Sequence, residues 1–92
     1  MSLKFEWDNR KAKTNLRKHK VSFEEAATVF GDPLSLTIPD LLHSIVENRF
    51  ITIGRAMTER TLVVIHTDRR NSIRIISARV ATKHERRQYE ES

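Results

Sequence analysis

The sequence predicts an α+β fold in which helices pack on a small antiparallel sheet, within a single domain spanning residues 1–92. Four segments rich in β-branched residues follow one another between residues 34 and 79 with short connections, which favours an antiparallel meander. Two helix-start signals precede these strands and one follows them. The expected order is β-α-α-β-β-β-β-α, with the two N-terminal helices on one face of the sheet and the opposite face partly open.

The N-terminal elements are predicted from their caps. Residues 4–7 indicate a short strand, and Asp8 is a suitable N-cap for a helix over residues 9–19. Ser22 and Glu25 form the capping box S-x-x-E of a second helix. Its apolar stripe recurs at helical spacing, and Gly31 is expected to end it in a left-handed conformation. The stripe consists of Phe23, Ala26, Ala27 and Phe30.

The strands are expected at residues 34–38, 49–55, 61–67 and 72–79. The third of these is apolar on both faces, which is typical of a central strand. Gly54 indicates a bulge or a close backbone approach. Thr82 and Glu85 form a second capping box, which opens a charged C-terminal helix with little to bury apart from Tyr89.

The net charge of +5 is unevenly distributed. Residues 22–48 contain five acidic residues and no Lys or Arg, whereas residues 1–21 contain seven basic residues and residues 49–92 contain ten. This asymmetry indicates a basic working surface, separate from an acidic one, that suits a polyanion. The alternative is a solvated surface of mixed charge.

Several classes of protein are disfavoured by what the sequence lacks. It contains no cysteine, which fits a reducing cytosol, and no apolar run approaches the roughly 18 residues that a membrane span needs. It also lacks a signal peptide, so we expect a cytoplasmic protein without membrane association. No Gly-rich phosphate loop, G-x-S-x-G or CxxC motif occurs, which argues against nucleotide-driven, serine-hydrolase and redox chemistry.

The four histidines lack metal-ligand spacing, so neither a metal nor another cofactor is expected. His66 shares one face of a predicted strand with apolar residues, and such a histidine is more often a hydrogen-bonded core residue than a ligand.

Arginines at strand ends are the most informative candidates for function. A guanidinium group that a rigid strand holds in place grips phosphate through two parallel hydrogen bonds. Arg55 and Arg79 both end strands, and both reach one phosphate if those strands are neighbours; otherwise they are solvated strand ends. Strict alternation puts Arg74 on the opposite pleat from Arg79, where it more often forms a surface salt bridge.

Candidate groups for proton transfer and base contacts each have a structural alternative. His19 follows Lys18 at the end of the first helix, where the helix dipole favours a protonated imidazole, or it caps the helix against the core. Glu47 either acts as a base or pairs with Arg49. Tyr89 either stacks on a base or anchors the last helix.

An ordered series of short motifs runs over nearly the whole chain. It comprises Phe5-Glu6-Trp7-Asp8, Lys11, Asn15, Arg17-Lys18-His19, Val21-Ser22-Phe23-Glu24-Glu25-Ala26, Asp32-Pro33, Glu47-Asn48-Arg49-Phe50, Ile53-Gly54-Arg55, Val64-Ile65-His66-Thr67, Ile75-Ile76-Ser77-Ala78-Arg79 and Glu85-Arg86-Arg87 with Tyr89. In this order the series resembles the BrnT toxins of bacterial type II toxin–antitoxin systems. That family usually has a glycine after the histidine, where this chain has Lys20, so Lys20 must tolerate a left-handed or altered helix end.

The resemblance implies a RelE-like ribonuclease fold, toxicity through RNA cleavage and a block of translation. It also implies neutralisation by a BrnA-like antitoxin, a DNA-binding protein, so that operator DNA is contacted only through the complex. The alternative function is a non-catalytic nucleic-acid-binding or operon-regulatory module, because phosphate binding needs the same basic residues.

Metal-independent RNA cleavage requires a base for the 2′-hydroxyl proton, cations for the phosphate charge and an acid for the leaving oxygen. We therefore expect basic side chains in the active site, and we expect the antitoxin to bind across the basic face of the sheet. The predicted catalytic residues are Arg55 and Arg79 as phosphate clamps and His19, Lys18 and Glu47 for proton transfer; Arg49, Arg74 and Tyr89 are predicted to contact RNA.

Overall fold

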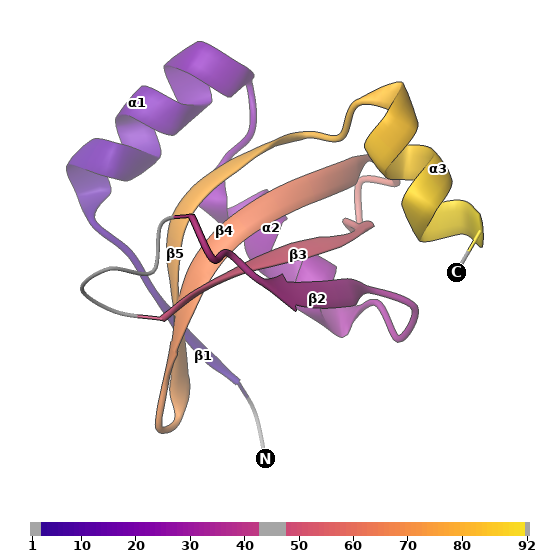
Figure 1. Ribbon diagram of the computed structural model, residues 1–92. Coiled ribbons are helices and arrows are strands. Elements are labelled where there is room, and N and C mark those ends of the chain that lie inside the picture. The colour runs from indigo at the N-terminus through magenta and orange to yellow at the C-terminus, as the bar shows by residue number, and fades with distance from the viewer. Residues whose placement is uncertain (1–2, 43–47, 92) are drawn as a thin grey trace.

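The computed structural model of the chain describes residues 3–42 and 48–91 (Figure 1). Glu47, one of the predicted catalytic residues, lies outside the described residues. None of the helices in the described ranges is long and apolar enough to span a membrane. The elements are, in order, β1 (Lys4–Glu6), α1 (Asn9–His19), α2 (Phe23–Thr28), the 3-10 turn η1 (Val29–Gly31), β2 (Leu36–Pro39), β3 (Arg49–Arg55), β4 (Thr61–Arg69), β5 (Ser72–Val80) and α3 (Lys83–Glu91).

The sheet has five strands in the order β1-β5-β4-β3-β2. β2 to β5 form an antiparallel meander, which confirms the predicted α+β class. The prediction of a wholly antiparallel sheet is wrong, because β1 pairs in parallel with β5 and makes the sheet mixed. A parallel pairing requires a long crossover, and here the chain from β1 passes through both N-terminal helices and three strands before it reaches β5.

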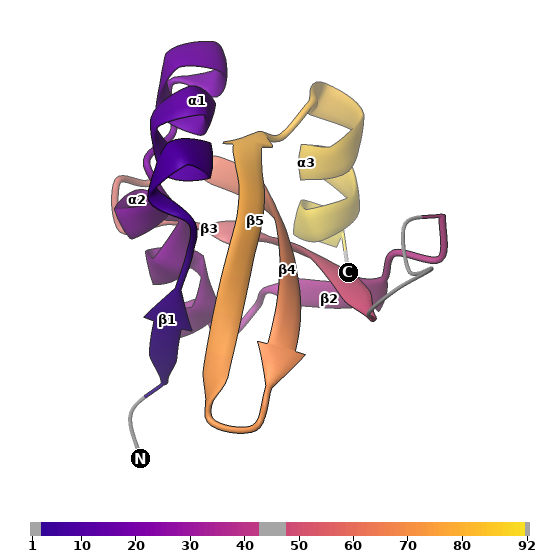
Figure 2. The same ribbon diagram turned by 90° about the vertical axis from the view of Figure 1, so that its left-hand side faces the viewer.

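Helices cover both faces of the sheet. α1 and α2 lie on one face, over the main core, and α3 lies on the other face, so that β5 runs between α1 and α3 in two views (Figures 1 and 2). Tyr89 of α3 packs on a second apolar cluster formed by Ile53, Val63 and Ala81. Tyr89 thus supplies the packing of α3 on the sheet, as the sequence predicts, and no residue of α3 is fully buried. The fully buried residues of the main core include Val21, Phe23, Ala26, Val29, Leu62 and Val64.

The ends of α1 form as the sequence predicts. The carboxylate of Asp8 accepts hydrogen bonds from the backbone N–H groups of Arg10 and Lys11 at 2.8 and 3.1 Å. Lys20 ends the helix in the left-handed region, with φ 59° and ψ 32°, and its N–H donates to the Leu16 carbonyl. This conformation costs a residue with a Cβ about 1 kcal/mol relative to glycine. The left-handed helix end predicted for Lys20 is confirmed.

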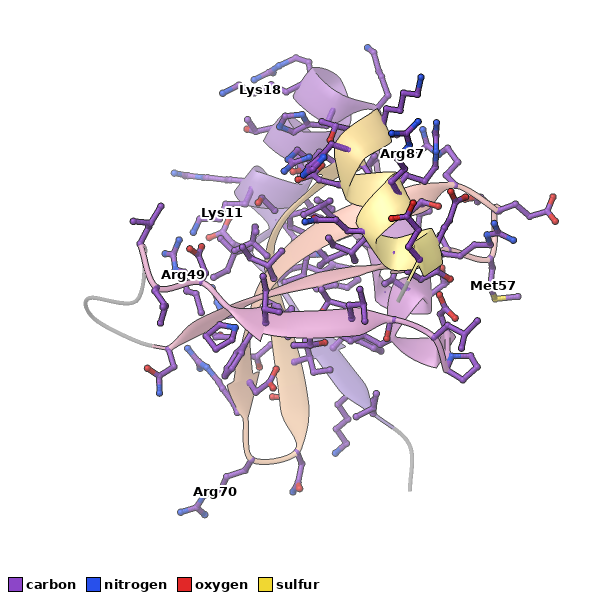
Figure 3. The ribbon with its side chains drawn as sticks, turned by 45° about the vertical axis from the view of Figure 1, so that its right-hand side comes forward. Lys11, Lys18, Arg49, Met57, Arg70 and Arg87 are labelled. Atoms are coloured by element: carbon purple, nitrogen blue, oxygen red, sulfur yellow. The ribbon has the colours of Figure 1, made fainter. Side chains whose placement is uncertain are left out.

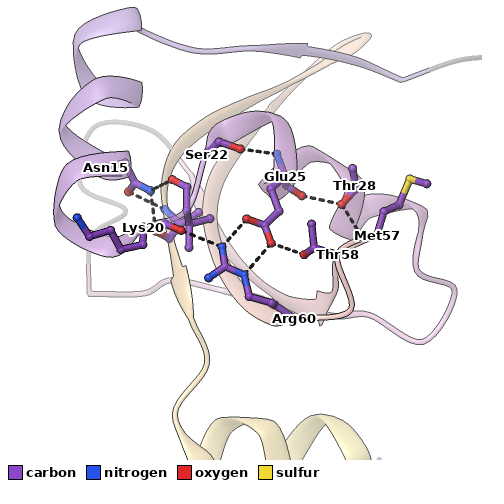
Figure 4. Close-up of polar contacts among 10 residues, drawn as sticks. Asn15, Lys20, Ser22, Glu25, Thr28, Met57, Thr58 and Arg60 are labelled. Carbon is purple, nitrogen blue, oxygen red and sulfur yellow. Dashed lines mark hydrogen bonds and ion pairs between the residues drawn. The ribbon is translucent and has the colours of Figure 1, made fainter.

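The start of α2 keeps only half of its predicted capping box. The Ser22 hydroxyl accepts from the Glu25 N–H at 3.0 Å, as expected. The Glu25 carboxylate does not return to the cap, because it accepts from Arg60 Nε at 2.9 Å and Nη2 at 2.5 Å, and from the Thr58 hydroxyl (Figure 4). The same Arg60 Nη2 donates to the Lys20 carbonyl at 2.8 Å. Arg60 thus joins the turn between β3 and β4 to both N-terminal helices.

The end of α2 differs from the prediction for Gly31. The helix tightens into η1, the Asp32 N–H donates to the Val29 carbonyl at 3.0 Å, and Gly31 is not left-handed. The expectation of a close approach at Gly54 is confirmed, because a Cβ there would lie 2.8 Å from Val29 Cγ1 and 2.9 Å from Ser35 Cβ. β3 and η1 therefore depend on the absence of a side chain at Gly54.

Candidate functional site

A buried asparagine sets the position of α1 relative to β5. Asn15 is 5% exposed, and its Nδ2 donates to the carbonyls of Val21 and Ala78 at 2.9 and 2.8 Å. Its Oδ1 accepts from the Ala78 N–H at 3.0 Å. These bonds fix the last turn of α1 beside the C-terminal half of β5. The sequence signal was an asparagine, a poor helix former, in the middle of a predicted helix.

A pocket of about 310 Å³ lies between α1 and the edge of β5. It brings Lys18 and His19, both predicted for proton transfer, beside Ser77, and Lys11 also lines it. Lys11 and Lys18 project outward from α1, and in this view they lie on the same side of the molecule as Arg49 (Figure 3). The pocket is therefore bordered by cations, as a site for phosphate requires.

Arg79 lies two residues beyond Ser77 on the same face of β5, about 7 Å farther along the strand. Its Nη1 and Nη2 donate to the two carboxylate oxygens of Glu85, both at 2.7 Å. Glu85 and Thr82 also complete the predicted capping box of α3, with reciprocal bonds of 2.9 and 3.2 Å. One carboxylate therefore starts α3 and orients Arg79, a second role that the sequence did not reveal.

The Arg79–Glu85 pair is ionised and leaves part of the guanidinium accessible. Hydrogen bonds from Arg79, with further bonds from Thr82, lower the pKa of Glu85 to about 2, and the same pairing raises the pKa of Arg79. Of the five guanidinium N–H groups, Glu85 takes one from Nη1 and one from Nη2. The edge formed by Nε and Nη2 keeps two parallel donors, and the side chain is 42% exposed. Arg79 is thus held in place while it retains the geometry that binds phosphate.

Arg55 ends β3 on the same face of the sheet as Arg79, but β4 lies between their strands, so the idea that these strands are neighbours is wrong. α3 spans the interval between the two arginines. Glu85 holds Arg79, and one turn later the Tyr89 hydroxyl donates to Asp32 at 2.5 Å, where the Arg55 N–H also donates at 2.8 Å. β4 and α3 therefore separate the two arginines along this face of the sheet.

Tyr89 anchors α3 to the rest of the fold, which was the structural alternative to stacking on an RNA base. Its hydroxyl is bound to Asp32, which raises the pKa of Tyr89. Burial acts to raise the pKa of Asp32, but hydrogen bonds from the Arg55 N–H, the Tyr89 hydroxyl and the Leu34 N–H lower it overall. This carboxylate joins η1, β3 and α3.

A bulge in β5 changes the face on which Arg74 lies. Ile76 has no partner on β4, because Ser77 pairs with Ile65 whereas Ile75 pairs with His66. The alternation shifts by one residue, and Arg74 comes to the same face as Arg79, contrary to the prediction. Arg74 lies opposite Thr67, which also lies opposite Arg49 on β3. The structure thus places the two arginines predicted to contact RNA in one row across the sheet.

His66 is a core residue, as predicted. It is 2% exposed, its Nε2 accepts from the Thr52 hydroxyl at 2.7 Å and its Nδ1 bonds to Asp68 at 2.9 Å. Burial lowers its pKa despite the nearby carboxylate, so the imidazole is neutral. Within residues 3–42 and 48–91, no group of three or more His, Asp or Glu side chains is arranged to hold a metal ion.

Comparisons with known proteins show that this chain is related to toxins of type II toxin–antitoxin systems. The sequence model described as "Ribonuclease toxin, BrnT, of type II toxin-antitoxin system" matches residues 7–85. The chain therefore belongs to the BrnT family. The crystal structure of the Brucella abortus ribonuclease toxin BrnT aligns with a TM-score of 0.68 and 22% sequence identity, covering 89% of this chain and all of that one, which establishes the shared fold. No curated protein matches the chain at a significant level.

Proposed function

We propose that this protein is a metal-independent endoribonuclease that cleaves cytoplasmic RNA and thereby blocks translation. The observation that carries the proposal is the Arg79 guanidinium. Glu85 holds it in place but leaves two phosphate-binding donors unpaired, next along β5 from the pocket of Lys18 and His19. Membership of the BrnT family supports RNA as the substrate and an antitoxin as the partner.

In the proposed reaction the 2′-oxygen of one nucleotide attacks the adjacent phosphorus, and the bond to the 5′-oxygen of the next nucleotide breaks. Arg79 stabilises the charge that develops on the non-bridging oxygens. Lys18 and His19 transfer the protons, one from the attacking hydroxyl and one to the leaving oxygen. Glu85 positions Arg79 and does not act as the base, because a carboxylate with a pKa of about 2 is a weak proton acceptor near neutral pH. Glu47 remains a predicted base.

We further propose that a BrnA-like antitoxin neutralises the protein by covering the unpaired donors of Arg79 and the basic pocket. Operator DNA would then be bound only through the antitoxin of the complex. Co-expression tests this, because the antitoxin should restore growth and protect cellular RNA. An antitoxin that restores growth while purified complex still cleaves RNA at the full rate would contradict it.

The decisive experiment measures cleavage of labelled RNA by purified protein in EDTA. We expect wild-type protein to cleave and Arg79→Ala to be about 10²–10³-fold slower, because it loses a preorganised donor to the developing anion. Arg70→Ala is the matched control, because Arg70 is exposed at the far tip of the β4–β5 hairpin (Figure 3). Full activity of folded Arg79→Ala, or activity that needs a divalent ion, contradicts the proposal. RNA binding by wild-type protein without cleavage would support the regulatory alternative.

Arg55 and Arg79 should contribute independently. Because α3 lies between them, we expect the logarithmic losses of Arg55→Ala and Arg79→Ala to add in the double variant. A double variant no slower than Arg79→Ala alone would show that both arginines grip the same phosphate.

A further inference from the structure

A row of polar side chains crosses the face of the sheet that carries Arg79. The register places Arg49 of β3, Thr67 of β4, Arg74 of β5 and Glu6 of β1 side by side. α3 packs over Ile53 and Val63, toward the other end of the same strands. The row is therefore separate from the pocket beside α1, although both lie along β5.

Two members of this row, Thr67 and Glu6, each hold a buried side-chain oxygen that has no hydrogen-bond partner among the described residues. Thr67 is 2% exposed, and its unpaired oxygen is the hydroxyl. Leaving a buried hydroxyl unpaired is unfavourable, and such a group needs an explanation. The neighbouring Arg74 is only loosely held, because its Nη1 is 3.8 Å from Glu6 Oε1, beyond hydrogen-bonding distance. Arg69 approaches the same oxygen at 3.4 Å.

We propose that Arg49, Thr67 and Arg74 form a second phosphate-binding subsite, which takes a backbone phosphate of a single-stranded RNA that also occupies the Arg79 site. Phosphate draws the guanidinium of Arg74 away from Glu6, and the Thr67 hydroxyl donates to a phosphate oxygen. This inference rests on the proposed function, since it assigns a further contact to the same substrate. It gives the unpaired hydroxyl a ligand that the free protein lacks.

The spacing of the two subsites sets the length of the substrate. Arg79 lies opposite Val63 on β4, and Thr67 is four residues farther along that strand, or about 13 Å at the rise of a β-strand. A stacked strand advances about 3.4 Å per nucleotide, so roughly four nucleotides span both subsites. A dinucleotide would reach only the Arg79 site.

The test compares Thr67→Val with Thr52→Val, two substitutions that remove a buried hydroxyl from opposite faces of the sheet. Thr52 is fully buried and bonded to both His66 and Thr37. Thr67→Val should unfold at or above the wild-type midpoint and bind a labelled RNA octamer about three- to tenfold more weakly. Thr52→Val should unfold at a lower temperature and bind the octamer normally. Binding is measured in the Arg79→Ala background, in which cleavage is expected to be too slow to consume the RNA during the measurement.

Two further measurements assign the effect to phosphate. Arg74→Gln should weaken octamer binding and lower the slope of log affinity against log salt by about 1, because one phosphate contact is lost. Thr67→Val and Arg74→Gln should slow cleavage of the octamer more than cleavage of a dinucleotide, because a dinucleotide does not reach the second subsite. Unchanged octamer binding by both variants, or a loss of stability in Thr67→Val like that of Thr52→Val, overturns the subsite. Absence of RNA cleavage by the wild-type protein refutes the proposed function instead, and the binding measurements still decide the subsite.

Discussion

The protein uses the same ion pair, an arginine with a glutamate, in two regions with different results. Arg60 donates hydrogen bonds from Nε and Nη2 to the carboxylate of Glu25. The second hydrogen of Arg60 Nη2 is donated to the Lys20 carbonyl. Arg79 donates to Glu85 only from Nη1 and Nη2, one hydrogen bond from each. The two arginine side chains are almost equally exposed, at 38% and 42%. Exposure does not distinguish the structural pair from the candidate functional one.

The difference lies in which donors remain. No two-donor edge of Arg60 is left, because both of its Nη2 hydrogens are used, whereas Arg79 keeps its Nε–Nη2 edge. A phosphate can therefore be gripped through two parallel bonds at Arg79 and not at Arg60. An inventory of donors separates a structural arginine from a binding one where exposure and pairing do not.

The largest effect on stability is expected from Arg60→Ala. It leaves Glu25, whose side chain is 10% exposed, with the Thr58 hydroxyl as its remaining side-chain donor, which should lower the free energy of unfolding by about 2–3 kcal/mol. Urea titration measures this loss, and cleavage per folded molecule should stay at the wild-type value. The double variant Glu25→Ala/Arg60→Ala is the control and should recover part of the stability. A hundredfold loss of cleavage in folded Arg60→Ala would show that the Arg60–Glu25 pair also takes part in cleavage and is not only structural.

The next largest effect is expected on the rate of RNA cleavage by Glu85→Gln, a substitution that keeps the shape of the side chain but removes its charge. Arg79 is then held by a weaker partner, and we expect about a tenfold slower cleavage, the lower end of the effect of removing a supporting contact. The loss should appear mainly in kcat, because the positioning matters most in the transition state. A variant with wild-type kcat would show that Arg79 orients itself without Glu85.

Acid should weaken both pairs. The pKa values of Glu25 and Glu85 are lowered by their arginines, that of Glu85 from an ordinary 4.5 to about 2. A carboxylate whose pKa is lower in the folded protein than in the unfolded chain stabilises the fold at pH values above the pKa of the unfolded chain. This stabilisation disappears as the pH falls through the pKa of the folded protein. The stability difference between wild type and Glu85→Gln should therefore shrink as pH falls from about 4.5 to about 2 in a series of urea titrations. A difference that is independent of pH in this interval contradicts the assignment.

The smallest effect is expected from Lys20→Gly, at the residue whose carbonyl Arg60 binds. Relief of the left-handed backbone should outweigh the greater entropy of the unfolded glycine, so stability should rise by about 0.5 kcal/mol. Lys20→Ala is the matched control and should leave stability near wild type, because alanine keeps the backbone penalty. An equal gain in both variants would attribute the effect to the charge of Lys20.

The sequence predicted the elements that have strong local signals. Asp8, Ser22 and the Thr82–Glu85 box mark helix starts, whereas the requirement on Lys20 came from the resemblance to a family that usually has glycine at this position. Arg79 was found because it ends a long β-branched segment. The strand β1 was predicted but its parallel pairing with β5 was not, since three residues carry too little periodicity to indicate their partner, and the pairing depends on tertiary packing.

The site was predicted less completely because its geometry depends on two nonlocal features. The bulge at Ile76 reverses the face of Arg74, and its only signal was the adjacent pair Ile75-Ile76 in an otherwise alternating strand. The second role of Glu85 depends on the turn that brings α3 back over β5, which a capping box alone does not specify. Asn15 likewise binds Ala78, a residue far away in the chain.

The parallel pairing of β1 with β5 has a consequence for biosynthesis. Lys4 leaves the ribosome well before its partner Ser72, and the candidate site also needs Arg79 and Glu85. Domains acquire such nonlocal contacts only after the later segment has emerged, at a synthesis rate of about 5–20 residues per second. The nascent chain therefore cannot assemble the site while most of it is still being made. A protein that attacks RNA would thus remain harmless to the messenger and ribosome producing it until α3 is translated.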